Sequence, residues 1–528
     1  MRRMPPVPLL QGSQLNIAPL VRIKFRQGGI FLPRKLPIFY SALLLTGVNL
    51  LLRFVSTSFQ VYISGKIGAA GVGLLQLVLS VGSLALVVGV AGIRTSTMYL
   101  SAEALGKKNP AQIRPILSGC FLYSILCSST VALILYAAAP YLAEFWIGNI
   151  HTLSAIRLYA AFLPVNCLCG VMTGYFTAAN RIGTLAAVEV AEQLASMAVT
   201  TTLLINWAGH NAVKACQCII LGNGISMCLT LCCLVFLRLK EPIVNGPRLP
   251  VRKPLLNTAV PLALADNLKV GISTTENLMV PKRLALYPGV ADPLAAFGMV
   301  CGMVFPVVMF PAAILYALAE LLIPELARCA AAGSKRRIQY LSARSLRTAI
   351  LYGCCFGAME FLLAKELCLW LYKTDEAAAY MRLYALLVPM LYCDAITDAM
   401  IKGLGQQKAS VRYNILTSAM DVIGLFILLP IYGMGGYYFS FLITHLLNFL
   451  LSIRRLFRIT GKTISFRLPF LALVGTSAAV GIVYPVDSPL LQISGFLICF
   501  LSILFLLRVL QEEDILWIRG LVKRKSGS

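Results

Sequence analysis

The stretch RLYAAFLP, from Arg157 to Pro164, recurs as RLYALLVP from Arg382 to Pro389, and each copy lies near the start of a long apolar run. The two copies begin 225 residues apart, at positions 157 and 382 of a 528-residue chain. An internally duplicated apolar unit is typical of membrane transporters, in which two related halves move against each other around a site at their interface. The repeat therefore predicts a duplicated membrane fold.

The composition also indicates a membrane protein. Hydrophobic residues make up 59% of the chain, charged residues 13%, and the mean hydropathy is +0.81. A helix needs about 20 apolar residues to cross the hydrocarbon core with its backbone groups satisfied. By this criterion we predict an all-α polytopic membrane protein with about 14 transmembrane helices. The predicted spans are 38–60, 74–99, 116–139, 153–179, 184–206, 212–237, 255–280, 295–323, 344–364, 378–401, 410–430, 433–453, 468–486 and 489–509.

The first twelve spans divide into two six-helix pseudo-symmetric bundles, followed by two extra C-terminal helices. Two weaker matches keep the order of the repeat, because Asn49 corresponds to Asn267 and Glu103 corresponds to Glu325. The predicted organisation is a basic N-terminal segment (1–37), a first bundle (38–240), a linker (241–254), a second bundle (255–456), the extra helix pair (467–510) and a basic tail (511–528).

The basic residues predict the orientation of the chain. Lys and Arg gather before the first span, in the linker, after the eighth and twelfth spans and in the tail, while the alternate loops hold few. Loops rich in Lys and Arg stay on the cytoplasmic side, so we expect both termini to be cytoplasmic. Much of the net charge of +25 then serves topology and contact with anionic lipids. A soluble basic domain with aromatic stacking residues is lacking, so nucleic-acid binding is not expected.

The cysteines and loops limit the chemistry that is open to the chain. The 16 cysteines show no Cys-x-x-Cys spacing and no His partners at ligand distance, so we expect free thiols, no metal site and no bound cofactor. The loops are too short for a catalytic domain, which speaks against a membrane-embedded glycosyltransferase or polymerase.

Ionisable residues inside spans are candidates for function, since a charge at bilayer depth is costly unless it faces a cavity or a partner. Arg53 lies one helical turn after Asn49 in the first span, so both side chains point to one side. The predicted substrate cavity contains Asn49, Arg53, Arg94, Asn267, Lys269 and Glu276. Headgroup contact for Arg94 and mutual neutralisation of Asp266 and Lys269 are the structural alternatives.

Two carboxylate pairs are candidates for coupling to a cation. Glu189 and Glu192 share one face of the fifth span, and Asp394 and Asp398 share one face of the tenth. Crowded carboxylates can bind Na⁺ or retain H⁺. A polar clamp between packed helices is the alternative for both pairs.

Glycine and proline mark the spans that are expected to bend. We predict gating positions at Gly89 in the second span and at Pro306 and Pro311 in the eighth, because Gly permits close approach and Pro kinks a helix. The two extra spans carry a strip of small residues from Gly475 to Gly481, which suits either helix packing or a lipid tail.

Several short motifs carry a family resemblance. They are Gly65-Lys66-Ile67-Gly68 after Arg53, Val280-Pro281-Lys282-Arg283-Leu284, Phe297-Gly298-Met299, Phe305-Pro306, Phe310-Pro311 and LLIPEL at 321–326. The chain resembles the polysaccharide-exporter and flippase branch of the multidrug/oligosaccharidyl-lipid/polysaccharide (MOP) superfamily, closest to the stage V sporulation protein B and lipid II flippase groups. The resemblance implies a V-shaped, two-bundle fold, alternating access and a basic cavity, to which Arg53 and Arg94 would map.

We therefore expect a flippase that moves a lipid-linked envelope oligosaccharide or peptidoglycan precursor from the inner to the outer leaflet of a bacterial cell membrane. It is expected to make and break no covalent bonds, and Na⁺ or H⁺ is the candidate coupling ion. The alternative is a cation-coupled multidrug antiporter of the same superfamily.

Overall fold

The structure is a computed structural model that describes residues 38–90, 92–107, 109–179, 181–209, 211–241, 252–461, 467–486, 488–507 and 509. All regular elements in these residues are helices, which confirms the predicted class. The α-helices are α1 (Ile38–Val90), α2 (Ile93–Gly106), α3 (Ile113–Tyr141), α4 (Leu153–Ala178), α5 (Ile182–Leu203), α6 (Ala212–Leu239), α7 (Arg252–Leu284), α8 (Pro293–Gly298), α9 (Phe305–Val308), α10 (Ala312–Ala331), α11 (Lys335–Leu362), α12 (Ala364–Tyr372), α13 (Ala378–Ala385), α14 (Val388–Gly403), α15 (Gln407–Tyr432), α16 (Met434–Thr460), α17 (Arg467–Val483) and α18 (Pro489–Leu506). Short 3₁₀ or π elements are η1 (Pro110–Gln112), η2 (Leu142–Ile147), η3 (Ile150–Thr152), η4 (Leu204–Ala208) and η5 (Met299–Val304).

Each predicted span coincides with a helix or a bent pair of helices. Within the described ranges, eight helices are long and apolar enough to cross a membrane, and two bent pairs raise this number to ten. One of the eight, 50–105, is 56 residues long and contains the second predicted span and part of the first. The helices α7, α11 and α17 also lie at predicted spans, but they are too polar or too short to meet the same test. The count of fourteen therefore stays a prediction.

A glycine divides α1 where the sequence predicts a loop. At 1.5 Å per residue a straight helix of this length would extend about 80 Å, far more than the hydrocarbon core of about 30 Å. The backbone of Gly68 has φ 71° and ψ 173°, so α1 consists of two helices merged across a kink. A side chain at this φ would be strained, which explains why Gly is needed here.

The eighth predicted span is a broken helix. The segment α8–η5–α9 meets α10 at an angle of 63°. Pro306 is the second residue of α9, and Pro311 immediately precedes α10. Proline has no N–H and breaks the helical ladder, so carbonyl groups in this segment need other donors. Hydroxyl groups of neighbouring helices supply them: Ser64 donates to the carbonyl of Gly302 at 3.3 Å, and Tyr372, Tyr392 and Tyr352 donate at 2.9 Å to the carbonyls of Met303, Val308 and Pro311.

The helices of the two halves pack in the same pattern. In the first half α4 packs against α2, α3 and α6, and α5 packs against α6. In the second half α14 packs against α10, α11 and α16, and α15 packs against α16. The first copy of the repeat lies in α4, and the second lies across α13 and α14. The sequence duplication is thus visible as a duplication of packing.

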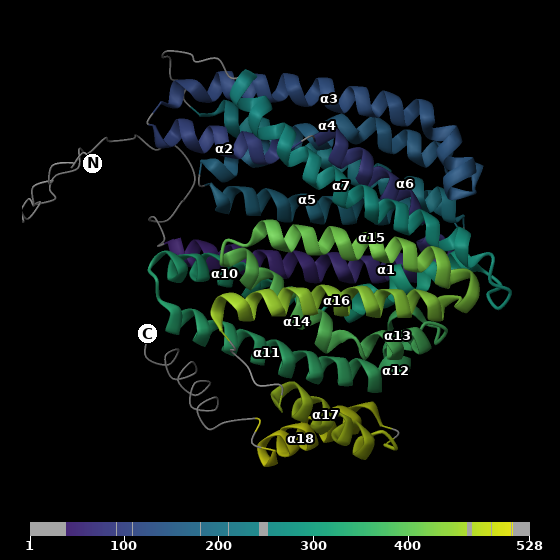
Figure 1. Cartoon of the computed structure of the whole chain (residues 1–528). Helices are drawn as coiled ribbons and strands as arrows, with labels where there is room; N and C mark the ends of the chain where they lie inside the picture. Colours follow the sequence, from purple (N-terminus) through teal and green to yellow (C-terminus); the bar gives the residue numbers. More distant parts are fainter. Residues whose placement is uncertain are drawn as a thin grey trace, which may run out of the picture.

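The two halves meet along α1 and α7. These helices contact each other, α1 contacts α3 and α4 as well as α8, and α7 contacts α15 (Figure 1). The contact between α1 and α8 is very close, since a Cβ added to Gly298 would lie 2.0 Å from the carbonyl oxygen of Ala69. The predicted bundle boundaries stay a prediction, and 1–37, most of the 241–254 linker and 511–528 lie outside the described residues.

The extra pair α17 and α18 packs together and against α11 (Figure 1). A Cβ added to Gly475 would lie 3.2 Å from Ile503, so α18 fills the space beside this part of the small-residue strip. No described atom lies within 4 Å of the equivalent position at Gly481. Helix packing therefore accounts for the strip at Gly475.

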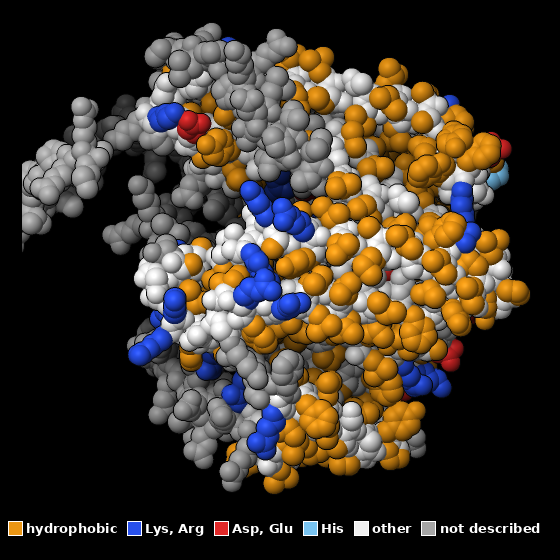
Figure 2. Space-filling view, in the orientation of Figure 1, with side chains coloured by type: hydrophobic (Ala, Val, Ile, Leu, Met, Phe, Trp, Pro, Cys, Tyr) orange, Lys and Arg blue, Asp and Glu red, His pale blue; other side chains and the backbone are white. Residues whose placement is uncertain are grey.

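The surface agrees with a protein that lies in a bilayer. Figure 2 shows hydrophobic side chains over much of the described surface on this face, while most of the visible Lys and Arg side chains lie in the left half of the view. Large apolar side chains such as Leu133, Phe426 and Leu490 are exposed. Exposed apolar surface of this extent is costly in water and stable in lipid.

Candidate functional site

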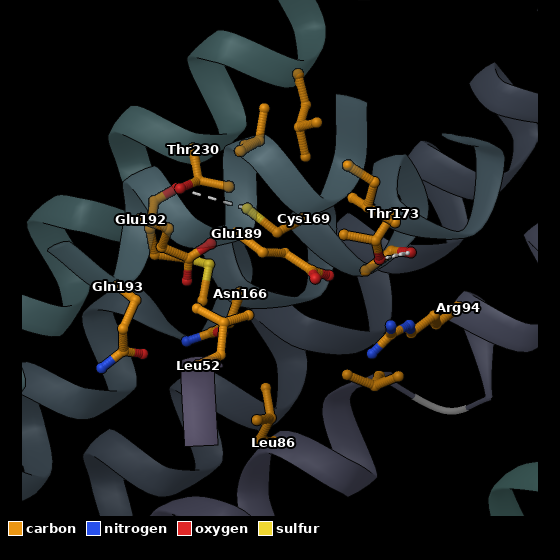
Figure 3. Close-up of a pocket in the computed structure, with 16 residues that line it drawn as sticks. Leu52, Leu86, Arg94, Asn166, Cys169, Thr173, Glu189, Glu192, Gln193 and Thr230 are labelled. Carbon is orange, nitrogen blue, oxygen red and sulfur yellow. Dashed lines mark hydrogen bonds between the residues drawn. The ribbon is translucent and has the colours of Figure 1, made fainter. Parts of the chain in front are cut away.

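A cavity of 380 Å³ lies within the first group of helices and is lined by α1, α2, α4, α5 and α6. It brings together three predicted site residues, Arg94, Glu189 and Glu192, which the sequence placed in two different roles (Figure 3). The other polar side chains that line it are Asn166, Thr173, Gln193 and Thr230.

Local backbone features position these charges. The two glutamates are three residues apart on α5 and so present one face to the cavity. Gly92 adopts φ 71° between α1 and α2, just before Arg94. On α4, a Cβ at Gly174 would lie 2.4 Å from the carbonyl oxygen of Arg94, so glycine is required for α4 to approach α2.

The cavity carries more negative than positive charge. Arg94 attracts Glu189, and Glu192 and Thr230 both line the cavity. No ion pair between Arg94 and either glutamate occurs among the described residues. Two carboxylates opposed by one guanidinium leave a site that suits a cation or a bound proton, because a buried charge without a counter-charge is costly.

Arg53 lies outside the lining of this cavity, at the junction of the two halves. Its guanidinium lies over the ring of Tyr316 on α10, 4.5 Å from the ring centroid, and its side chain is exposed. Its neighbour Leu52 lines the cavity. A cation–π contact satisfies the charge of Arg53 only partly, so its donors remain available to an anion.

The other residues of the predicted substrate cavity are not brought together with Arg94. The side chain of Asn49 lies outside the described residues. On α7, the Oδ1 atom of Asn267 is buried and has no hydrogen-bond partner within the described part of the chain, whereas Lys269 is exposed.

Glu276 has a partner that the sequence did not predict. Its carboxyl group lies beside the carboxyl group of Asp421 on α15. The Oδ1 atom of Asp421 also accepts hydrogen bonds from Ser440 at 2.6 Å and Thr444 at 3.3 Å, both on α16. We call Glu276, Asp421, Ser440 and Thr444 the carboxyl cluster. Two neighbouring carboxylates repel each other when both are charged, so this arrangement suits a proton or a cation held between them.

A sequence signal for the carboxyl cluster does exist. Ser440 and Thr444 are four residues apart and so lie on one helical face, opposite an aspartate in the middle of the preceding span. The pairing itself is not evident from the sequence, because Glu276 and Asp421 are 145 positions apart and only tertiary packing joins α7 to α15.

The two aspartates of the tenth predicted span have separate partners. Asp394 accepts hydrogen bonds from Asn448 at 3.1 and 3.3 Å and lies 4.0 Å from His445. Asp398 forms an ion pair with Lys402 at 2.5 Å and accepts a hydrogen bond from Ser410. This arrangement fits the polar clamp between helices better than a shared cation.

The remaining predictions concern gating and metal binding. Gly89 lies at a close contact, since a Cβ there would be 2.9 Å from the side chain of Leu163 on α4. Pro306 and Pro311 lie at the bend of the broken helix. Over the described ranges, no group of three or more His, Cys, Asp or Glu residues could hold a metal ion.

Comparison with known proteins supports a transporter class. Residues 46–208 match the model of the MatE family. The chain is 22% identical over 410 residues to stage V sporulation protein B of Bacillus subtilis (strain 168), which covers 75% of this chain and 78% of that protein.

Solved structures share the fold. An inward-facing multidrug resistance MATE family transporter of the MOP superfamily matches with a TM-score of 0.64 at 12% identity, covering 80% of this chain and 100% of that chain. The lipid II flippase MurJ in an inward closed conformation matches with a TM-score of 0.63 at 12% identity, covering 91% and 100%.

The solved structures that share this fold are a multidrug transporter and a flippase, which agrees with the transporter class expected from the sequence. The matches agree with the resemblance to the MOP superfamily seen in the sequence, and stage V sporulation protein B and the lipid II flippase agree with its flippase branch.

Proposed function

We propose that the chain is a flippase that moves a lipid-linked saccharide of the cell envelope from the inner to the outer leaflet by alternating access. The observation that carries this proposal is the helix pair α17 and α18 beyond the duplicated core. The lipid II flippase covers 91% of the chain, whereas a complete multidrug transporter covers only 80%. About a fifth of this chain lies outside the match to the multidrug transporter, and this additional part favours the flippase class.

The position of Arg53 suits an anionic headgroup, and Arg94 is the second arginine near it in the chain. Arg53 lies at the junction of α1 and α10, and Arg94 faces the cavity of the first half. A guanidinium can grip a phosphate with two parallel hydrogen bonds. In the proposed cycle Arg53 leaves the ring of Tyr316 and binds the headgroup. The close contact between Gly298 of α8 and α1 then opens, and the headgroup is released.

The carboxyl cluster is the proposed coupling site for H⁺. A proton held between Glu276 and Asp421 would lie beside α7, which contacts α1 of the first half and α15 of the second. Release of that proton would leave two adjacent negative charges in a buried site, so protonation is tied to the packing of α7 against α15. Glu189 and Glu192 remain candidates for a cation within the first half.

A cation-coupled multidrug antiporter is the second candidate. The cavity beside Arg94 holds two carboxylates and one guanidinium, which suits an organic cation better than a diphosphate. The MatE family match also covers most of the residues that line this cavity. These observations favour the antiporter, while the extra helix pair favours the flippase.

A transport panel separates the two candidates. Purified protein in liposomes is offered fluorescent lipid-linked saccharides in one set of vesicles and an organic cation such as ethidium in another. The flippase moves the saccharide headgroup across the bilayer and leaves ethidium where it is. Ethidium transport without saccharide movement would replace the proposal by the antiporter.

We further propose a bacterial cell membrane location with both termini cytoplasmic, supported by the distribution of Lys and Arg along the chain. Cysteine introduced at exposed Ser334 should be protected from an impermeant thiol reagent in intact cells, and cysteine at exposed Ala285 should be labelled. The reverse pattern would invert the topology.

A further inference from the structure

A second cavity, of 720 Å³, lies at one end of the first helix group, where α2, α4 and α6 end and α3 begins. It shares no lining residue with the cavity beside Arg94. Its charged lining residues are Arg114, Arg181, Arg238 and Glu241.

A single carboxylate holds two of these arginines in place. Glu241 forms ion pairs with Arg181 at 2.7 Å and with Arg238 at 3.3 Å, and it accepts a hydrogen bond from the Tyr175 hydroxyl. The guanidinium of Arg238 also lies 5.1 Å from the centroid of the Tyr175 ring. The arginines are therefore ordered before any ligand arrives.

The ordered group keeps an excess of positive charge. Three arginines and one glutamate leave a formal charge of +2 around the cavity. The side chain of Arg181 is 47% exposed although it is paired, and Arg114 is exposed and forms no ion pair within the described part of the chain. Each guanidinium has five N–H donors, so both can accept a further anion.

The wall of the same cavity is apolar. Leu105, Ile113, Leu117, Phe121 and Leu239 line it beside the arginines. The Arg cluster thus stands at a helix end, and the apolar wall continues along α3 into the span. A phosphate carried on an acyl chain matches this combination, whereas a soluble anion would leave the apolar wall exposed to water.

We propose that this cavity binds an anionic phospholipid, with its phosphate at Arg114 and Arg181 and one acyl chain along Leu117 and Phe121. The site does not depend on the identity of the transported cargo. Because α2, α4 and α6 contribute to both cavities, a bound lipid would tie together three of the helices that line the Arg94 cavity.

Lipid binding to the purified full-length protein tests the proposal. The protein in phosphatidylcholine nanodiscs is titrated with phosphatidylglycerol, and bound lipid is counted by native mass spectrometry. A basic residue near a membrane surface contributes about 1 kcal/mol to anionic lipid binding, so Arg114→Ala and Arg181→Ala should each weaken it about fivefold. Arg328→Ala, which removes an exposed charge outside the cavity, is the matched control and should leave the affinity unchanged.

Two further measurements keep the result unambiguous. Phe121→Ala should weaken phosphatidylglycerol binding, and soluble glycerol phosphate should bind poorly to every variant. Equal binding of glycerol phosphate and phosphatidylglycerol would overturn the lipid assignment, as would equal losses in Arg328→Ala and Arg114→Ala. Without added lipid, Arg114→Ala should melt at the same temperature as the unchanged protein. If its affinity for phosphatidylglycerol is also unchanged, the lipid does not bind at this cavity.

Discussion

Arg53 is held by an aromatic ring of the other half of the protein, and no carboxylate pairs with it among the residues that the structure describes. Its depth in the first span was predicted from the sequence, because position along an apolar run gives depth directly. Its contact with Tyr316 was not predicted from the sequence, because residues 53 and 316 meet only through the packing of α1 against α10. The same limit applies to Glu276 and Asp421, whereas the shared face of Glu189 and Glu192 followed from helical spacing alone.

The role of Arg53 is tested by two substitutions. Arg53→Ala should reduce transport of a lipid-linked saccharide about thirtyfold, because a charge-assisted hydrogen bond contributes about 2 kcal/mol. Arg53→Lys should restore little, since an ammonium cannot form the bidentate contact. Initial flipping rates in liposomes give the values. Tyr316→Phe keeps the ring and serves as the control with near-normal rates; full activity of Arg53→Ala would exclude Arg53 from the site.

The carboxyl cluster gives a second prediction at this scale. Glu276→Gln and Asp421→Asn keep the shape of the side chains but remove the shared proton, so each should abolish the response of transport to an imposed pH gradient. Glu320→Gln, an exposed carboxyl on α10, is the matched control and should respond normally. A normal pH response in both cluster variants would show that H⁺ is coupled elsewhere.

The two copies of the repeat differ in helix geometry. The first copy lies in α4, which continues through Pro164, while the second is divided by a bend of 52° between α13 and α14, just before Pro389. Tyr384 of the second copy is fully buried against the rings of Phe305 and Tyr438. The sequence predicted that both copies occupy equivalent spans, but not this asymmetry, because both carry proline at the same position and only their neighbours differ.

The broken helix is stabilised by hydroxyl donors from other helices, and Tyr392→Phe tests this directly. The substitution removes the 2.9 Å hydrogen bond to the buried carbonyl of Val308, so the free energy of unfolding should fall by about 1–2 kcal/mol. A lower apparent melting temperature in detergent reports the loss. Tyr380→Phe, whose hydroxyl makes no hydrogen bond within the described ranges, should melt normally; equal melting of both variants would contradict the role of Tyr392.

At the scale of the whole molecule, the sequence predicted the helical class and where the apolar helices lie, because hydropathy is a local property, while the count of fourteen spans stays a prediction. It did not predict the break at Gly92 inside the second predicted span or the carboxyl cluster, which depend on backbone dihedrals and on contacts between distant helices. The fold admits either a lipid-linked or a soluble cargo, and the helix pair α17 and α18 is the feature that favours the lipid.

The central claim is tested most directly by following one long-tailed, fluorescent lipid-linked saccharide in liposomes that contain the purified protein. An impermeant quencher is added outside, and the loss of signal reports headgroups that reach the outer leaflet. The account predicts that nearly all of the signal becomes quenchable with the unchanged protein, and only the outer-leaflet share with Arg53→Ala or with empty liposomes. If the unchanged, correctly folded protein gives quenching of the outer leaflet alone with every donor supplied, the claim that this chain is a flippase is contradicted.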